Sequence, residues 1–307
     1  MNSQARRSAA LVLIFAVLSL AACGQPEPSS PAVAVPEEAA FARPAGTEAF
    51  TALISGTRVG QMEVQHGDVT EVGYEYRNNG RGPSVEEVIE FTDEGVPRSW
   101  RITGATTFGN IIEEQFEVQG GTASWTDTTG SSASDLAEAN LYVAQESSPY
   151  ALWVYARLLL AAEGNTLAVL PAGELKLEAI DTLDVTGSDG ASTAITTYAL
   201  SGIDLNPSYF ALDEDGMLFA SMNERFALVR TGFEQEEQRL RDLAAEYATR
   251  RFESIQEQVT RVFDKPVRIN NVRVFDPNSL SLTDPDSGLV ADNQIASVDD
   301  VVEIAGT

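Results

Sequence analysis

The sequence is poor in the residues that most often carry enzyme chemistry. Its 307 residues contain one histidine, His66, and one cysteine, Cys23. Hydrolytic zinc sites use several protein ligands, commonly histidines, and a Ser-His-Asp triad would have to recruit His66 in a chain without a Gly-x-Ser-x-Gly elbow. A chain with a single cysteine cannot form an internal disulfide. The sequence therefore predicts neither a catalytic residue nor a metal site, and it places His66 in a surface hairpin.

Paired carboxylates do not provide a catalytic site either. Glu86-Glu87 and Glu113-Glu114 lie in runs of alternating apolar residues that are typical of strands. Neighbours in a strand point to opposite faces of the sheet. Neither pair can therefore place two carboxylates on one substrate, as a glycosidase requires.

Basic residues are also scarce, with 20 Lys and Arg against 46 Asp and Glu and a net charge of −26. Residues 1–22 hold two arginines and no acid, so the chain without them has a charge of 18 − 46 = −28. This charge excludes nucleic acid as an expected partner and repels an anionic membrane, although a covalent lipid could still tether the protein. The acidity is equally compatible with a role in solubility or salt tolerance.

The N-terminus has the pattern of a secretory leader. Arg6-Arg7 precede an apolar run over residues 9–20, which is short for a membrane span and typical of a signal peptide. The following Leu20-Ala21-Ala22-Cys23 resembles a bacterial lipobox, which implies a signal peptide over 1–22 and a lipid on Cys23; a plain leader with an incidental cysteine is the alternative. The proline-rich residues 23–47 predict a disordered tether. Gly24 after the cysteine favours the outer membrane, with the protein facing the periplasm.

Residues 48–232 predict an α+β fold that is mostly antiparallel β, a curved β-meander with one buried helix. Short alternating runs are separated by turns such as Asn78-Asn79-Gly80. An apolar run over 149–162 predicts a helix, and its length and Arg157 favour burial against the sheet over a membrane span. The acids of Asp213-Glu214-Asp215-Gly216 predict a solvated turn, because a calcium loop needs more oxygen ligands. The curved sheet and its helix resemble periplasmic lipoprotein-carrier domains in architecture.

Residues 233–264 predict one long amphipathic helix, or two helices with a bend between them. The stretch 233–263 contains no Gly or Pro, and its apolar residues recur at steps of three and four. An acidic start and a basic second half suit the helix dipole. We expect it to link the β domain to the C-terminal segment, with partner binding as the alternative.

Residues 265–307 predict a small β-meander with two sequence motifs. Asn271-Val272-Arg273-Val274-Phe275-Asp276 is followed by residues 289–298, Leu-Val-Ala-Asp-Asn-Gln-Ile-Ala-Ser-Val, and then by a further strand over 301–304. These motifs resemble the opening β-sandwich of metal-dependent amidohydrolases of the imidazolonepropionase-like group, and residues 200–220 resemble an extra N-terminal domain of some secreted members. The resemblance implies that an Asp-x-His-x-His strand and a (β/α)8 barrel with divalent metal, such as zinc, would follow. The sequence reaches Thr307 before either.

Two functions remain open from the sequence. The first is the N-terminal part of a lipid-tethered amidohydrolase, a hydrolase of non-peptide C–N bonds, which is truncated or interrupted and inactive alone. Its missing barrel would be an intramolecular or intermolecular partner, and this chain itself would bind no cofactor. The second is a free-standing envelope lipoprotein that binds an apolar ligand or a protein partner.

Overall fold

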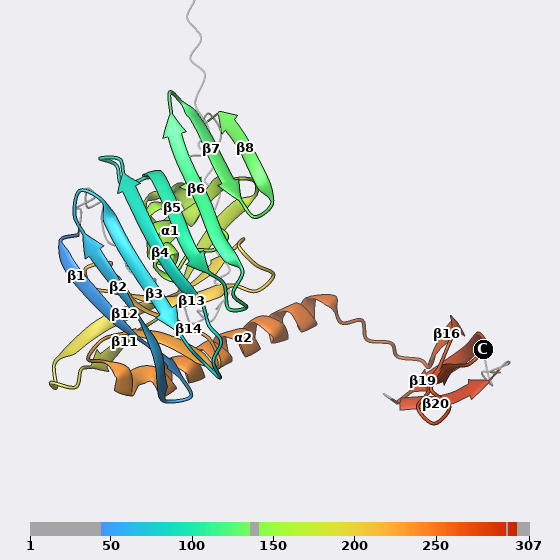
Figure 1. Cartoon of the computed structure of the whole chain (residues 1–307). Helices are drawn as coiled ribbons and strands as arrows, with labels where there is room; N and C mark the ends of the chain where they lie inside the picture. The colour runs from blue at the N-terminus through green and yellow to red at the C-terminus, as the bar shows by residue number, and fades with distance from the viewer. Residues whose placement is uncertain (1–43, 136–140, 293, 300–307) are drawn as a thin grey trace, which may run out of the picture. The chain divides into compact units, whose positions relative to one another are not determined.

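The computed structural model of the protein describes residues 44–135, 141–292 and 294–299 (Figure 1). The predicted signal peptide, Cys23, nearly all of the predicted tether and the predicted strand at 301–304 lie outside these residues. The main element is a curved 15-stranded sheet with the order β8-β7-β6-β5-β4-β3-β2-β1-β15-β14-β13-β12-β11-β10-β9. All of its strand pairs are antiparallel except β9 with β10. The predicted fold class, mostly antiparallel α+β with a curved sheet, is confirmed.

The first eight strands form a continuous meander from the middle of the sheet to one edge. They are β1 (Gly46–Ile54), β2 (Thr57–His66), β3 (Thr70–Tyr76), β4 (Ser84–Phe91), β5 (Pro97–Ala105), β6 (Ile111–Gln119), β7 (Thr122–Asp127) and β8 (Gly130–Asp135). Burial alternates along them; β3, for example, buries every second residue. This alternation places one face of each strand in a core and the other in solvent.

The other seven strands form the second half, which begins beside β1. They are β9 (Leu141–Tyr142), β10 (Thr166–Leu170), β11 (Glu174–Thr186), β12 (Ser192–Ser201), β13 (Ser208–Asp213), β14 (Leu218–Met222) and β15 (Phe226–Arg230). β15 joins the two halves of the sheet by pairing with β1, and Phe50 lies opposite Arg230. Strands β13 to β15 are buried on both faces, because each face of this half is covered by a helix.

Helix α1 (Tyr150–Ala161) covers the concave face of the sheet (Figure 1). It lies in one hydrophobic core together with inward residues such as Met62, Phe116 and Leu228. A short 3-10 turn, η1 (Glu163–Asn165), ends it. The predicted buried helix is therefore present at the predicted place. No helix among the described residues is long and apolar enough to cross a membrane.

Helix α2 (Glu237–Val259) follows the 3-10 turn η2 (Glu234–Glu236) and covers the opposite face of the second half. Leu240, Ala244 and Tyr247 lie in a second core with Ala227 and Val229, the strand neighbours of Leu228. The apolar stripe continues beyond this core, but its second half is exposed. The sequence predicted a helix that links the β domain to the C-terminal segment, and the structure adds that the first half of α2 packs on the sheet as a layer of the β domain.

The C-terminal segment forms two small antiparallel sheets. One sheet has the order β16-β19-β20 and the other pairs β17 with β18. The strands are β16 (Val267–Val272), β17 (Phe275–Asp276), β18 (Ser281–Leu282), β19 (Asp286–Ala291) and β20 (Gln294–Asp299). The single strand predicted over 267–275 is broken after Val272, where Asn271 has a positive φ of 58°.

Candidate functional site

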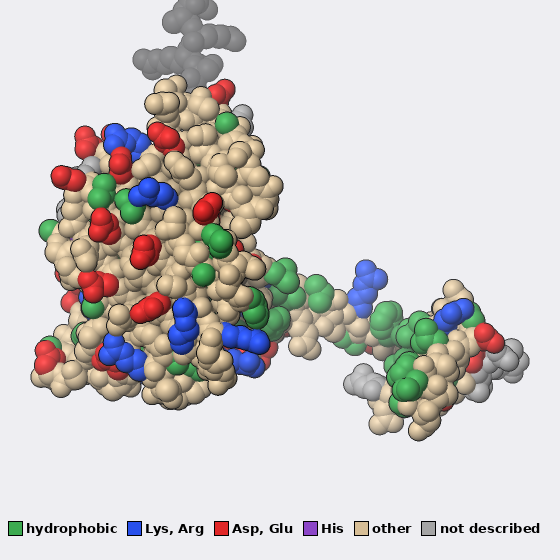
Figure 2. Space-filling model, in the orientation of Figure 1, with side chains coloured by type: hydrophobic (Ala, Val, Ile, Leu, Met, Phe, Trp, Pro, Cys, Tyr) green, Lys and Arg blue, Asp and Glu red, His purple; other side chains and the backbone are tan. Residues whose placement is uncertain are grey.

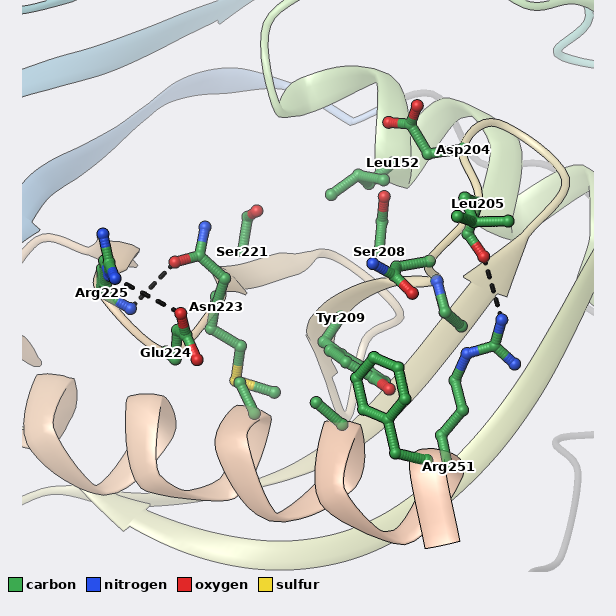
Figure 3. Close-up of a pocket in the computed structure, with 16 residues that line it drawn as sticks. Leu152, Asp204, Leu205, Ser208, Tyr209, Ser221, Asn223, Glu224, Arg225 and Arg251 are labelled. Carbon is green, nitrogen blue, oxygen red and sulfur yellow. Dashed lines mark hydrogen bonds and ion pairs between the residues drawn. The ribbon is translucent and has the colours of Figure 1, made fainter. Parts of the chain in front are cut away.

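The candidate site is a groove of about 800 Å³ at one end of the sheet (Figure 3). Segments far apart in the sequence form it: the β12–β13 loop (residues 202–207), the start of β13, the end of β14, the β14–β15 turn (residues 223–225) and α2. Leu152 from α1 also lines it. We call it the α2 groove. Its volume lies in the range of small-molecule binding sites.

Small side chains on α2 leave room for this groove. Ala244 and Ala248 are one helical turn apart, on the face that α2 turns toward the sheet. Larger residues at these positions would fill the space between helix and strands, as Leu240 and Tyr247 do elsewhere in the same core. Apolar atoms also come from Tyr209, Met222 and Phe252, among other lining residues. The floor therefore offers an apolar surface next to solvent.

Polar groups stand on two sides of the groove. Figure 3 shows Asn223, Glu224 and Arg225 on one side and Leu205 and Arg251 on the other. The Asn223 side-chain oxygen accepts hydrogen bonds from the backbone N–H groups of Arg225 and Phe226 at 2.9 and 3.0 Å, which fixes the turn. The Arg225 guanidinium lies 3.6 Å from Glu224 and is largely exposed.

Arg251 is held in place by one of its terminal nitrogens. Its Nη2 donates to the backbone carbonyl of Leu205 at 2.9 Å, which ties α2 to the β12–β13 loop. Its Nε is buried and has no hydrogen-bond partner among the described residues. Buried donors are normally satisfied, so this Nε is an exception in a residue that lines the groove.

Tyrosines form the wall between the groove and the second core. The rings of Tyr209 and Tyr247 lie 5.6 Å apart, and the Tyr247 hydroxyl is 3.0 Å from that of Thr197. Burial raises the pKa of the Tyr209 hydroxyl, although Arg251 and Arg250 partly oppose this effect. Tyr209 is therefore neutral at physiological pH, and it adds a ring surface to the site without adding charge.

Buried carboxylates on the concave face serve another purpose. Glu114 accepts hydrogen bonds from the Tyr142 hydroxyl at 2.7 Å and from the backbone N–H groups of Gln145 and Glu146 at 2.9 and 3.0 Å. Glu87 accepts from Trp100 Nε1 at 2.8 Å and from the backbone N–H of Ser148. Together these two residues attach the segment before α1 to the sheet.

The register explains why these two acids act on one segment. Glu87 lies opposite Ile102, and Ile102 lies opposite Glu114, so the two acids share one row across β4, β5 and β6. Burial raises the pKa of the Glu87 carboxyl to about 7, although the hydrogen bonds from Ser148 and Trp100 partly oppose it. Both carboxyl groups accept hydrogen bonds from protein donors, so this row of the sheet holds the segment before α1 in place. We call this row the Glu87–Glu114 clamp.

His66 lies in the β2–β3 hairpin as predicted, but its side chain is buried, so the predicted surface position is wrong. It is the last residue of β2 and points to the concave face under α1, with a side chain that is 1% exposed. Its Nε2 lies 2.9 Å from Glu48, and its ring is 6.1 Å from the ring of Tyr150. Glu48 in turn lies 3.6 Å from Arg230. His66 thus belongs to a charge network that joins β1, β2 and β15.

The acidic turn of the β13–β14 hairpin is ordered by its own backbone. Asp213 accepts hydrogen bonds from the N–H groups of Asp215 and Met217 at 3.0 and 2.9 Å, and it pairs with Arg230 at 2.6 Å. Only Glu214 and Asp215 are solvated as predicted. Within the residues that the structure describes, no group of three or more His, Cys, Asp or Glu side chains is placed to hold a metal ion.

The sequence did not predict the α2 groove. Its lining comes from Leu152 and from residues within 204–209, 221–225 and 244–252, and the sequence analysis found no binding or catalytic motif in these stretches. One signal was present: Ala244 and Ala248 interrupt the larger side chains of the helix at the spacing of one turn. Cys23, the predicted lipidation site, lies outside the described residues.

Comparisons with known proteins give no family for this chain. No family model matches it, and no curated protein matches it either. Among solved structures, it is similar to the crystal structure of a beta-barrel-like protein of domain of unknown function DUF1849 from Brucella abortus. That match has 12% sequence identity and a TM-score of 0.39, and it covers 62% of this chain and 98% of the other. A similarity of this degree assigns no function.

These findings overturn the amidohydrolase prediction. No family model and no curated protein matches the chain, and this includes the amidohydrolases. The residues that suggested the family form short strands, β16 to β20, around positive-φ turns at Asn271 and Asp292. Runs of β-branched residues between Asn, Asp and Gly specify such hairpins in many unrelated proteins, so the motifs described a local structure and not a family.

Proposed function

We propose that the protein is a non-catalytic binding module that holds an amphipathic ligand in the α2 groove. The ligand would have an apolar chain of the acyl type and an anionic carboxylate or phosphate group. The observation that supports this proposal is the pairing of an apolar floor with Arg251, whose buried Nε has no protein acceptor among the described residues. An anion at this position would gain a charge-assisted hydrogen bond.

The same proposal includes a place in the bacterial envelope. A lipid on Cys23 would tether the protein to a membrane, with the folded part facing the periplasm. Lipids and their breakdown products would supply acyl-chain ligands there. The strong negative charge of the chain, −26, keeps such a protein soluble beside a membrane. A groove lined by α2 and two loops needs no metal or catalytic residue for this role.

The apolar floor is tested by filling it. We expect Ala248→Phe to weaken binding of the fluorescent probe 11-(dansylamino)undecanoic acid by about tenfold or more, because the added ring occupies the space of the chain. Binding is measured as saturable dansyl fluorescence with the purified chain from residue 24 onward. Thr249→Phe adds the same ring to the next residue of α2, which is exposed and does not line the groove. No saturable binding by the unchanged chain, or equal loss in both variants, would refute the proposal.

The anionic group is tested separately. Arg251→Gln should weaken binding of the dansyl acid by roughly tenfold, the usual order for one charge-assisted hydrogen bond. The neutral probe N-phenyl-1-naphthylamine should bind to this variant and to the unchanged chain alike. Arg250→Gln is the control, since Arg250 is the adjacent arginine and pairs with Asp181 outside the groove. An equal effect of Arg251→Gln on both probes would contradict a specific role for the anion.

A further inference from the structure

The two ends of the large sheet differ in charge and in exposed apolar groups. Alternating hairpin turns of an antiparallel meander lie at opposite ends, and the pairing of Ile54 with Phe226 places the β14–β15 turn at the same end as the β1–β2 turn. One end therefore consists of residues 55–56, 77–83, 106–110, 128–129, 171–173, 202–207 and 223–225, which we call the apolar rim. The other consists of residues 67–69, 92–96, 120–121, 187–191 and 214–217, which we call the acidic rim.

The acidic rim carries only one sign of charge. Its turns hold six acids and no lysine or arginine: Asp68, Asp93, Glu94, Asp189, Glu214 and Asp215. None of its residues is among the exposed large hydrophobic side chains of the described chain. This end is therefore built to remain in water.

The apolar rim has the opposite character. Leu205 and Phe108 sit in its loops with 90% and 77% of their surface exposed, and Ile111 starts the strand beside Phe108. Its turns carry Arg77, Arg81 and Arg225 against two acids, Asp204 and Glu224. In a chain with 46 acids and 20 basic residues, this local excess of arginine is unusual. Figure 2 shows acidic side chains spread over one face of the sheet domain.

The arginines are placed beside the apolar groups. The Arg81 guanidinium carbon lies 5.9 Å from the centre of the Phe108 ring, a cation–π contact at the tip of two neighbouring loops. Arg225 is exposed on the groove side of the rim, opposite the loop that carries Leu205. Arg77 instead donates to backbone carbonyls of its own loop and stiffens it. In a phospholipid membrane, apolar side chains can enter the boundary between head groups and acyl chains while adjacent arginines contact the phosphates. The apolar rim has this combination of side chains.

We propose that the apolar rim docks on the surface of a phospholipid bilayer. Phe108 and Leu205 would enter the head-group boundary, and Arg81 and Arg225 would lie at the level of the lipid phosphates. The net charge of the chain does not prevent this contact, because the acidic rim lies a full strand length away and the Debye length at physiological salt is only about 8 Å. The α2 groove opens at the same rim through the loop of Leu205. The inference goes beyond ligand binding and does not require a lipid on Cys23.

Vesicle flotation tests the proposal with the unlipidated chain from residue 24 onward. Vesicles of phosphatidylethanolamine and phosphatidylglycerol should carry the unchanged chain up a density gradient. The double variant Phe108→Ser with Leu205→Ser should lower the bound-to-free ratio by about tenfold, since both side chains lose their burial in lipid. Both are exposed in the free protein, so thermal unfolding should be unchanged.

The control removes a phenylalanine and a leucine that are also exposed but lie elsewhere. Phe275→Ser with Leu280→Ser changes side chains that are 56% and 77% exposed in the C-terminal segment, and it should leave flotation within about twofold. Ala248→Phe should also float normally, which separates a failure of docking from a failure of ligand binding. Equal loss in the rim and control variants would overturn the proposal. Absence of flotation of the unchanged chain would do so too, and would direct the rim toward a protein partner.

Discussion

Replacement of Glu114 by alanine is expected to lower the free energy of unfolding by about 3 kcal/mol. The substitution leaves the Tyr142 hydroxyl and the N–H groups of Gln145 and Glu146 without their acceptor. Each buried donor without a partner costs about 1–3 kcal/mol, and water can reach the two partly buried N–H groups and offset some of this cost. Urea denaturation followed by tryptophan fluorescence measures the change.

The adjacent residue gives the matched control. Glu113 lies on the opposite, solvent-facing side of β6, and Glu113→Ala should change the free energy of unfolding by less than about 0.5 kcal/mol. The two variants differ by one position in sequence and carry the same chemical change. Similar stabilities for both would mean that the Glu87–Glu114 clamp does not hold the segment before α1.

These acids show how far sequence reasoning could reach. Strand alternation was enough to predict that neighbouring acids face opposite sides, and the burial of Glu87 and Glu114 beside exposed Glu86 and Glu113 agrees with it. Alternation could not predict which member of each pair is buried. That depends on the long-range register, which aligns Glu87 and Glu114 through Ile102, and on where the segment after β9 crosses the concave face.

His66 and the α2 groove escaped prediction for the same reason. His66 ends a strand next to Gly67-Asp68, which locally favours an exposed turn, and only the position of α1 buries it. The groove is formed by loops and helices whose lining residues extend over a stretch from Leu152 to Phe252. Periodicity specifies each element, but the space left between elements depends on how they pack.

Only part of the apolar face of α2 is buried. Its periodicity predicted an apolar face along the helix, and the first half of this face is buried against β14 and β15 through Leu240 and Tyr247. Phe252 instead borders the α2 groove, and Val259 is exposed. A periodic pattern shows that a face is apolar, whereas the length of the sheet beneath it decides how much of that face is covered.

Glu87 should make stability depend on pH between about 4.5 and 7. Burial raises its pKa in the folded protein from the ordinary 4.5 to about 7, so over this range the folded state holds a proton that the unfolded state has lost. Folding then takes up a proton, and stability falls as pH rises. The stabilising contribution is complete below the unfolded pKa and is lost as pH rises through the folded pKa. The total is on the order of 3 kcal/mol.

Glu87→Gln removes this ionisation while keeping the shape of the protonated acid. The quantity to measure is the difference in unfolding free energy between variant and unchanged chain, by urea denaturation from pH 4 to pH 8. It should shift in favour of the variant by on the order of 3 kcal/mol as pH rises, whatever constant cost the amide adds at Trp100 and Ser148. Glu86→Gln, on the exposed face of β4, should show no such shift. A shift in favour of the unchanged chain would instead require a lowered pKa, because the folded state would then bind fewer protons than the unfolded state.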